Sequence, residues 1–109
     1  MALVEEVSIY GFGSFFNKKA QYQDIDILIL HQSTSYESCQ FSLWCKRYLL
    51  ANLSGADITV LSRSEERQLA FVEKSKAKCL GNVYKKSANN DLDEILAKAI
   101  GVNAFGRAI

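Results

Sequence analysis

The chain has 109 residues, of which 49% are hydrophobic and 23% are charged. This composition excludes an intrinsically disordered chain and predicts one compact domain with a modest core. The formal net charge of +1 gives no bulk attraction to nucleic acids or membranes. Because there is no proline and there are only six glycines, we expect no linker to divide residues 1–109.

The cysteines and the N-terminus indicate the compartment. Cys39, Cys45 and Cys79 are odd in number and widely spaced, which favours reduced thiols over a disulfide framework or a zinc site. The N-terminus carries Glu5 and Glu6 and lacks the pattern of a signal peptide, and no apolar run is long enough to span a membrane. We therefore expect a cytoplasmic protein with no membrane partner.

The first part of the chain predicts a strand, a short helix and a second strand. Residues 4–10 suit a strand that ends at the glycines of GFG. Ser14 is a candidate N-cap for a short helix over about residues 15–20. Residues 24–31, DIDILILH, are apolar on both faces, as a central strand requires. This second strand is the clearest element of the sequence.

A long helix is predicted next, over residues 36–53, after a polar turn at residues 32–35 that can cap it. Aromatic and apolar side chains recur along this segment at helical spacing, which favours packing in the core over a base-stacking face. These side chains are Phe41, Trp44, Tyr48 and Leu49.

The second half predicts a strand at residues 56–61 and a helix from Ser62 or Ser64 to about Lys76, with Glu65 and Glu66 in its first turn. Further elements follow in chain order: a turn at 81–82, a short edge strand at 83–84, a helix at 90–100 that ends at Gly101, and a loose or docking tail at 102–109. The alternation of strands and helices predicts a mixed α/β fold, with a core over about 4–86.

Two carboxylates stand at the beginning of the second strand. Side chains alternate along a strand, so Asp24 and Asp26 project from one face, and Ile25, Ile27 and Ile29 from the other. Two ionised carboxylates this close repel each other unless a positive charge lies between them. A hard cation such as Mg²⁺ prefers such oxygen ligands. Alone, the pair is equally compatible with a solvated strand end.

A third acid favours the metal site. Asp57 begins the strand ADITVL, at the position that Asp24 has in its own strand. If the two strands are neighbours, three carboxylates meet at one end of the sheet, where they can hold two metal ions for an in-line displacement at phosphorus. Gly11 and Gly13 would let the backbone approach a phosphate, and a helix N-terminus at Ser14 would offer free N–H groups to it.

These motifs in this order resemble a known family. Gly13-Ser14, a spacer, Asp24-Ile25-Asp26 and the later strand residue Asp57 are similar to the nucleotidyltransferase superfamily that includes DNA polymerase beta. The chain length and the closing LGNVYK segment narrow the resemblance to the minimal nucleotidyltransferases of bacteria and archaea. The resemblance covers most of residues 7–86 and implies the polymerase beta-like fold.

The resemblance also implies roles for individual residues. Gly13 and Ser14 would bind the β- and γ-phosphates of an incoming NTP, and Asp24, Asp26 and Asp57 would hold two Mg²⁺ ions, with Mn²⁺ as an alternative. Asp57 would also help to activate an acceptor hydroxyl. The sequence departs from the family after Gly13-Ser14, where Phe15, Phe16 and Asn17 replace a small residue and an arginine, and Gln23 stands where many members have serine. Lys18 and Lys19 are the nearest cations for a phosphate.

The implied reaction is transfer of NMP, with AMP from ATP as the expected case, to a hydroxyl group. Members of the family are often encoded beside a helical HEPN partner as the antitoxin of a toxin–antitoxin pair. The acceptor is therefore either a partner protein or an RNA end, and the apolar chain ends would suit a partner or a homodimer contact.

Two alternatives to an enzyme remain open. One is a non-catalytic module that keeps the fold and binds a partner protein. The other is an RNA-binding domain that uses residues 63–86. This stretch contains seven Lys/Arg and three Glu, which gives a local charge of 7 − 3 = +4.

Overall fold

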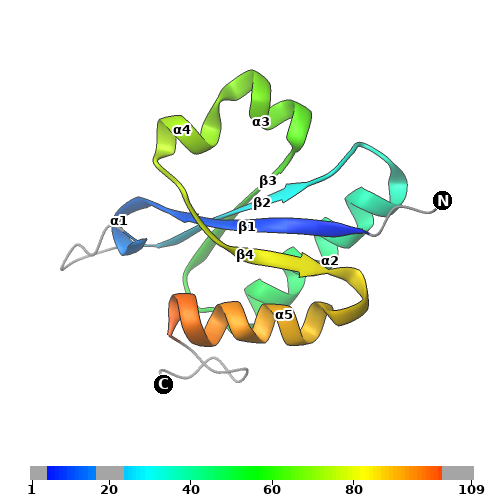
Figure 1. The fold of residues 1–109 in the computed structure, drawn as a ribbon. Coiled ribbons are helices and arrows are strands. Elements are labelled where there is room, and N and C mark those ends of the chain that lie inside the picture. Colours follow the sequence, from blue (N-terminus) through cyan, green and yellow to red (C-terminus); the bar gives the residue numbers. More distant parts are fainter. Residues whose placement is uncertain (1–4, 17–23, 102–109) are drawn as a thin grey trace.

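The computed structural model describes residues 5–16 and 24–101. They form one four-stranded sheet, in the order β3-β2-β1-β4, with helices on both faces (Figure 1). β1 pairs antiparallel with β2 and with β4, whereas β2 and β3 are parallel. The predicted mixed α/β fold is therefore confirmed. The strands are β1 (Glu6–Phe12), β2 (Ile25–His31), β3 (Ala56–Ser62) and β4 (Lys78–Tyr84).

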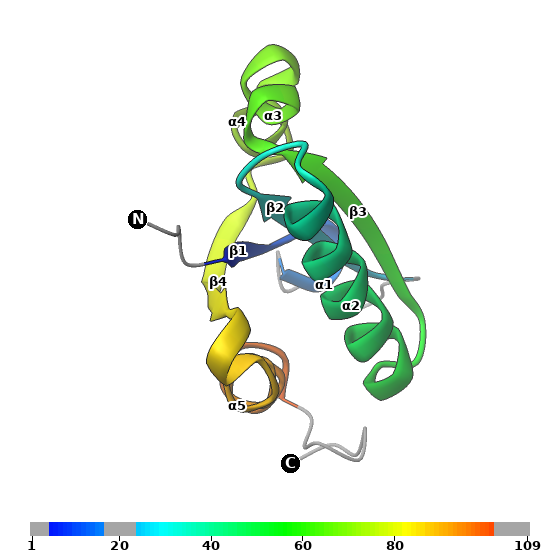
Figure 2. The same cartoon turned by 90° about the vertical axis from the view of Figure 1, so that its right-hand side faces the viewer.

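Helices occupy the connections between these strands and also follow the last strand. Figure 2 shows the pair α3 and α4 at one side of the molecule, and α5 at the opposite side. In chain order the helices are α1 (Gly13–Phe16), α2 (Tyr36–Asn52), α3 (Arg63–Leu69), α4 (Phe71–Ser75), the 3-10 turn η1 (Lys85–Ser87), α5 (Ala88–Ile95) and the π-helical turn η2 (Leu96–Ile100).

The main core lies between the sheet and the pair α2 and α5. Ile27 and Ile29 of β2 are fully buried there, against Leu49 of α2 and Leu92 of α5. On the other face of β2, Leu28 is also fully buried. A strand covered on both faces has no polar side, which is why DIDILILH is apolar throughout after its acids.

The turn between β2 and α2 is fixed by side-chain caps, as the sequence predicts. Ser35 is the N-cap of α2, and its hydroxyl accepts a hydrogen bond of 3.2 Å from the Ser38 N–H. The only histidine, His31, is buried at the end of β2, with Nδ1 at 2.7 Å from the Ser33 carbonyl oxygen and 3.2 Å from Ser38 Oγ. His31 thus ties the strand to the helix.

The aromatic stripe of α2 is only partly in the core. Phe41 and Leu49 are buried, and Tyr48 is partly buried against the core cluster. Trp44, in contrast, keeps 37% of its surface exposed. The prediction was wrong for Trp44, because this residue lies on the flank of the helix, where the sheet no longer covers it.

Two predicted boundaries also differ from the structure. The helix expected from Ser62 to about Lys76 is broken at Ala70, whose left-handed backbone (φ 50°) separates α3 from α4. The turn expected at 81–82 is absent among the described residues, because Gly81 lies inside the continuous edge strand β4, next to a register shift between Ile9 and Tyr10 of β1.

The remaining boundaries agree more closely. The last helix begins two residues earlier than predicted, at Ala88, and ends at Gly101 in a left-handed conformation, as expected. Val4 and the tail at 102–109 lie outside the described residues. Within the described ranges, no helix is long and apolar enough to cross a membrane.

Candidate functional site

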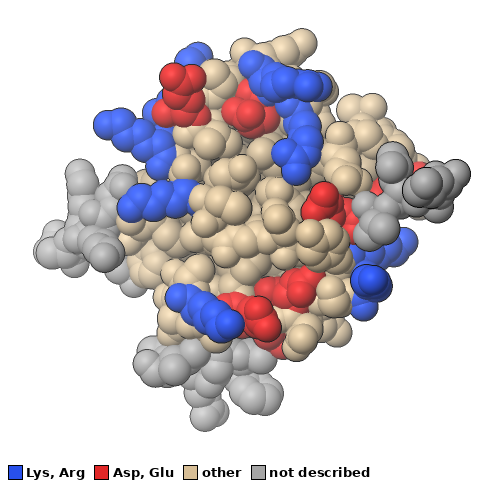
Figure 3. Space-filling view, in the orientation of Figure 1, with Lys and Arg blue, Asp and Glu red and all other residues tan. Residues whose placement is uncertain are grey.

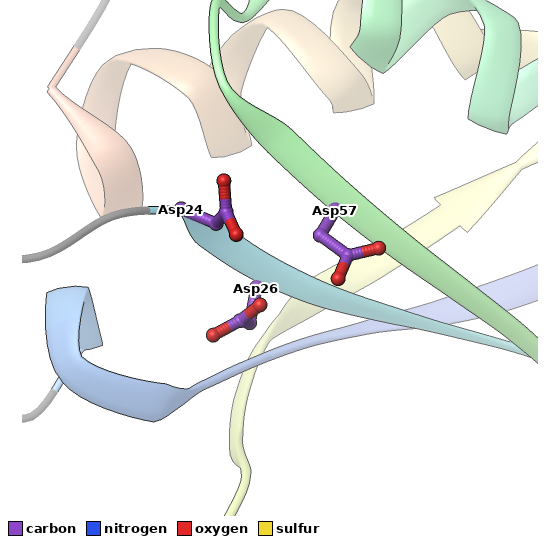
Figure 4. Close-up of side chains that lie close together, drawn as sticks. All are labelled: Asp24, Asp26 and Asp57. Atoms are coloured by element: carbon purple, nitrogen blue, oxygen red, sulfur yellow. The ribbon is translucent and has the colours of Figure 1, made fainter.

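The three predicted acids meet at one end of the sheet. Asp24, Asp26 and Asp57 each offer a carboxylate oxygen, and these three oxygens lie within 4.8 Å of one another. Figure 4 shows the side chains converging on one space, with Asp24 and Asp26 from the β2 segment and Asp57 from β3. The structure therefore brings together the whole predicted carboxylate set.

The pairing of β2 with β3 produces this convergence. The two strands are parallel, and Asp26 and Asp57 are direct register partners. A hydrogen bond of 2.9 Å from the Ile25 N–H to the Gly55 carbonyl oxygen fixes the register at the strand ends. Asp57 is therefore aligned with Asp26, so the predicted equivalence of Asp57 with Asp24 was wrong by two residues. Because side chains alternate with a period of two residues, Asp57 still lies on the predicted face of the sheet.

The cluster carries concentrated negative charge. Asp24 and Asp57 are exposed and Asp26 is partly buried. Partial burial raises the pKa of the Asp26 carboxyl above its ordinary value, and the charges of Asp57 and Asp24 raise it further. Each effect penalises the ionised form of Asp26, so a cation placed between the three carboxylates would relieve them.

This donor set fits a small hard cation. Mg²⁺ is held in proteins by one to a few carboxylate oxygens, and water and substrate phosphates complete its shell. Three carboxylate oxygens within 4.8 Å, with two of the residues exposed, provide such ligands and leave one side open. The absence of sulfur and imidazole from this cluster makes it unlike the zinc sites of proteins.

Gly13 connects the end of β1 to the acid cluster. Its backbone is left-handed (φ +81°), and a Cβ at this position would collide with the Asp26 carboxylate. Gly11 has a different neighbour, because a Cβ there would meet the Phe16 ring at 2.6 Å. The side-chain space beside Gly13 and Gly11 is thus occupied by an aspartate and an aromatic ring, and the approach of this backbone to a phosphate stays a prediction.

The turn after β1 differs in part from the prediction. The helix α1 begins at Gly13, so Ser14 is inside it and is not its N-cap. The described part of this helix is Gly13–Phe16, and residues 17–20 of the predicted segment lie outside the described residues. The predicted phosphate contacts Lys18 and Lys19 lie outside the described residues.

Sequence reasoning missed an aromatic pair beside the acids. Phe12 is the register partner of Asp26 across β1 and β2, and its ring packs edge-to-face on Phe71 of α4 at a centroid distance of 5.1 Å. Side chains alternate along β1, so Phe12 lies on the face opposite to the core residue Ile9. This alternation could have predicted the position of Phe12, but the predicted strand ended at Tyr10.

The basic stretch at 63–86 does not form one surface. Its residues are divided among α3, α4, β4 and η1, and Arg63 is engaged across the sheet, donating a hydrogen bond of 3.2 Å to Ser8 Oγ. On the face shown in Figure 3, the described basic and acidic side chains are interspersed around the rim. This arrangement does not support an RNA-binding surface made of the whole stretch.

No protein-family model matches the chain, and neither a curated protein nor a solved structure is significantly similar to it.

Proposed function

We propose that this protein is a Mg²⁺-dependent nucleotidyltransferase, with the acid cluster as its active site. The observation that supports the proposal is the convergence of Asp24, Asp26 and Asp57, whose carboxylate oxygens lie within 4.8 Å of one another. These residues are the ones that the resemblance to minimal nucleotidyltransferases assigns to catalysis. Gly13 and Ser14 are the proposed contacts of the NTP triphosphate. They adjoin the cluster, because the Asp26 carboxylate occupies the side-chain space of Gly13.

The proposed reaction joins an acceptor hydroxyl oxygen to the α-phosphorus of an NTP and breaks the bond between the α-phosphorus and the bridging oxygen to the β-phosphate, so pyrophosphate leaves. Asp24, Asp26 and Asp57 would hold two Mg²⁺ ions, which supply neutralisation of the phosphate charges when bound. We assign to Asp57 the orientation of the acceptor hydroxyl and the uptake of its proton. Catalysis on this account comes mainly from positioning.

The nucleotide and the acceptor follow from the resemblance. ATP is the proposed donor, and the acceptor is a hydroxyl group on a partner protein or at an RNA end. A HEPN-type protein is the proposed partner, which would make this chain the antitoxin of a toxin–antitoxin pair. Phe12, beside Asp26 and packed on Phe71, supplies an apolar contact next to the site for a base or an acceptor side chain.

The test is transfer of label from α-³²P-ATP and the other three NTPs, with Mg²⁺ or Mn²⁺, to a co-expressed partner and to RNA oligonucleotides. The nearly isosteric variants Asp24→Asn and Asp57→Asn should lose at least about 100-fold in rate, because charge stabilisation at such sites is worth several kcal/mol. Glu73→Gln is the matched control, since this exposed carboxylate of α4 is not part of the cluster.

Two results would count against an enzyme. One is the absence of NTP turnover with every metal and acceptor tested. The other is unchanged partner neutralisation when all three acids are replaced by asparagine in a folded protein. The second result would instead favour the non-catalytic binding module.

A further inference from the structure

A groove lies between α2 and the segment that joins β4 to α5. It consists of two adjoining cavities of about 450 and about 350 Å³, and both are lined by Trp44, Lys85 and Ala88. Tyr36, Phe41 and Arg47 of α2 complete the walls of the larger cavity, and Lys86 lines the smaller one. Volumes of this size are typical of ligand sites in proteins.

This groove is separate from the acid cluster. α2 and α5 pack against Ile27 and Ile29 of β2, on the face opposite to Asp26. The groove is also at the other end of the sheet: Tyr84, which precedes Lys85, pairs with Glu6, whereas the acid end is marked by Phe12 paired with Asp26. A ligand in the groove would therefore not contact the carboxylates of the acid cluster.

The charged groups of the groove are mainly cations. Arg47, Lys85 and Lys86 line it together with a single acid, Glu37. Among the residues that the structure describes, the one ion pair is Glu94 with Lys98, so these three cations have no carboxylate within 4.0 Å. The nearby acid Asp91 is occupied, because its Oδ2 accepts hydrogen bonds from the Tyr84 N–H and from Ser87 Oγ.

Aromatic rings and amides complete the lining. Tyr36 is 74% exposed at the mouth of the groove, and Trp44 is 37% exposed where the two cavities meet. The Trp44 ring is held by its neighbours, since it stacks on Tyr48 at 5.4 Å and on Phe41 at 6.5 Å. The side-chain amides of Gln40, Asn89 and Asn90 offer both donors and acceptors along the walls.

We propose that this groove binds single-stranded nucleic acid. Unpaired cations attract phosphates, and the exposed Tyr36 ring can stack on a base of any sequence, which is the combination that single-strand binding proteins use. Trp44, whose ring already stacks on Tyr48 and Phe41, lines the groove beside it, and the amides can hydrogen-bond to base edges. A peptide partner with an acidic rim would also meet the cations. The exposed leucines that would favour a peptide, Leu43 and Leu50 of α2, are however outside the lining of both cavities.

The single tryptophan of the chain makes the test direct, because Trp44 is part of the groove. Its fluorescence is recorded while oligo(U) or oligo(dT) of about twelve nucleotides is added in EDTA, with AMP and a helical acidic peptide in parallel. We expect saturable quenching by an oligonucleotide, and the RNA and DNA arms identify the sugar. Affinity should fall with salt, and Lys85→Ala should reduce the slope of log K on log salt by about 0.7.

Variants separate this site from the rest of the surface. Tyr36→Ala should weaken binding roughly 5- to 150-fold, the range that loss of one stacked base implies. The single variant Arg47→Glu should also weaken binding, whereas Lys74→Glu on α4, which makes the same change of charge, is the matched control and should change it little. Asp24→Asn should bind as the wild type does, so failure of the proposed transferase activity leaves this inference intact.

Several outcomes would overturn the proposal. These are no saturable change with either oligonucleotide up to about 100 µM, where even non-specific binding is detectable, or an equal loss with Lys74→Glu. Tighter binding of AMP or of the acidic peptide than of both oligonucleotides would assign the groove to a free nucleotide or to a protein partner instead.

Discussion

At Gly13 the backbone is left-handed (φ +81°) and the place of a side chain is taken by the Asp26 carboxylate. Gly13→Ala should therefore cost more than the usual 1–2 kcal/mol of a left-handed alanine, because Asp26 must also move. Gly101→Ala is the control: it is also left-handed (φ +93°), but no atom of the described residues lies within 4 Å of the added methyl group.

Urea unfolding of both variants measures the difference between them. If Gly13→Ala destabilises the protein no more than Gly101→Ala does, Asp26 moves at no cost and the contact is not tight. Either way, the comparison separates backbone strain from the collision, since the left-handed backbone is common to both positions.

Asp26 should destabilise the folded protein when it is ionised. Its pKa is raised on folding, first by burial and then by the charges of Asp57 and Asp24. The folded state thus holds this proton more tightly than the unfolded chain, so stability falls as pH rises from the ordinary pKa of 3.8 through the raised value. Asp26→Asn should raise the thermal midpoint at pH 7 without divalent cations.

The same measurement at low pH provides the check. The advantage of Asp26→Asn should shrink as pH falls below 3.8, where the wild-type carboxyl is protonated in both states. A lower midpoint for Asp26→Asn at pH 7 would show that the carboxylate makes a favourable contact stronger than the repulsion.

Individual residues differ in how far the sequence determines them. The face of Asp24 and Asp26 follows from strand alternation, so it could be predicted. The alignment of Asp57 with Asp26 could not, because register depends on which backbone groups pair across two strands. The exposure of Trp44 depends on the width of the sheet beneath α2, which helical spacing does not report.

At the scale of elements, one hydrogen bond links α2 to α5. Tyr48 Oη donates to Asp93 Oδ1 at 2.6 Å. This bond, with smaller contributions from burial and from the charge of Asp93, raises the pKa of Tyr48 from 10.0 to about 12. Tyr48→Phe should therefore cost about 1 kcal/mol at pH 7, which is below the usual range of about 1.5–3 kcal/mol for a charged acceptor because water reaches the pair.

The contribution of Tyr48 should also depend on pH. A phenol whose pKa is raised on folding contributes stability that is fully present below the unfolded value of 10.0 and is lost as pH rises through about 12. The gap between wild type and Tyr48→Phe in chemical unfolding should therefore close over that interval. Tyr36→Phe is the control, since this tyrosine is 74% exposed, and a gap that stays constant would contradict the assignment.

The boundaries of the elements could be predicted from the sequence only in part. The cap of α3 was predictable, because Ser62 and Glu65 form a capping box with bonds of 2.9 and 3.2 Å. The end of α3 was not predictable, because Ala70 adopts a left-handed conformation that is rare for alanine. Gly81-Asn82 resembled a turn, but Gly81 instead leaves room for Ile95 of α5, whose side chain lies 3.2 Å from the place of a Cβ.

For the whole molecule, the topology accounts for the site. β2 and β3 are parallel and are joined by α2, so both strands begin at the same end of the sheet. Acids at the start of each strand must then converge, and the sequence suffices for that once the pairing is known. Which strands pair is a property of the complete sheet. From the sequence, the convergence of the acids could therefore be predicted only on the assumption that the two strands are neighbours.

The convergence of the acids predicts that Mg²⁺ stabilises the fold. A cation that binds only the folded state adds RT ln(1 + [L]/Kd), about 1.4 kcal/mol at ten times Kd. For a domain of this size, that raises the thermal midpoint by several degrees. Asp57→Asn should remove most of the rise, and Glu73→Gln should keep it, because Asp57 belongs to the cluster and Glu73 does not. Sodium chloride at equal ionic strength controls for screening.

An equal rise of the thermal midpoint in sodium chloride would mean that the acids need only screening of their charge, and it would contradict the proposed metal site. A rise that is specific to Mg²⁺ and is lost in both Asp26→Asn and Asp57→Asn would instead require ligands on both strands, β2 and β3. Since the two strands hold their acids in register only when the sheet is formed, metal binding and folding are then linked through the same pairing.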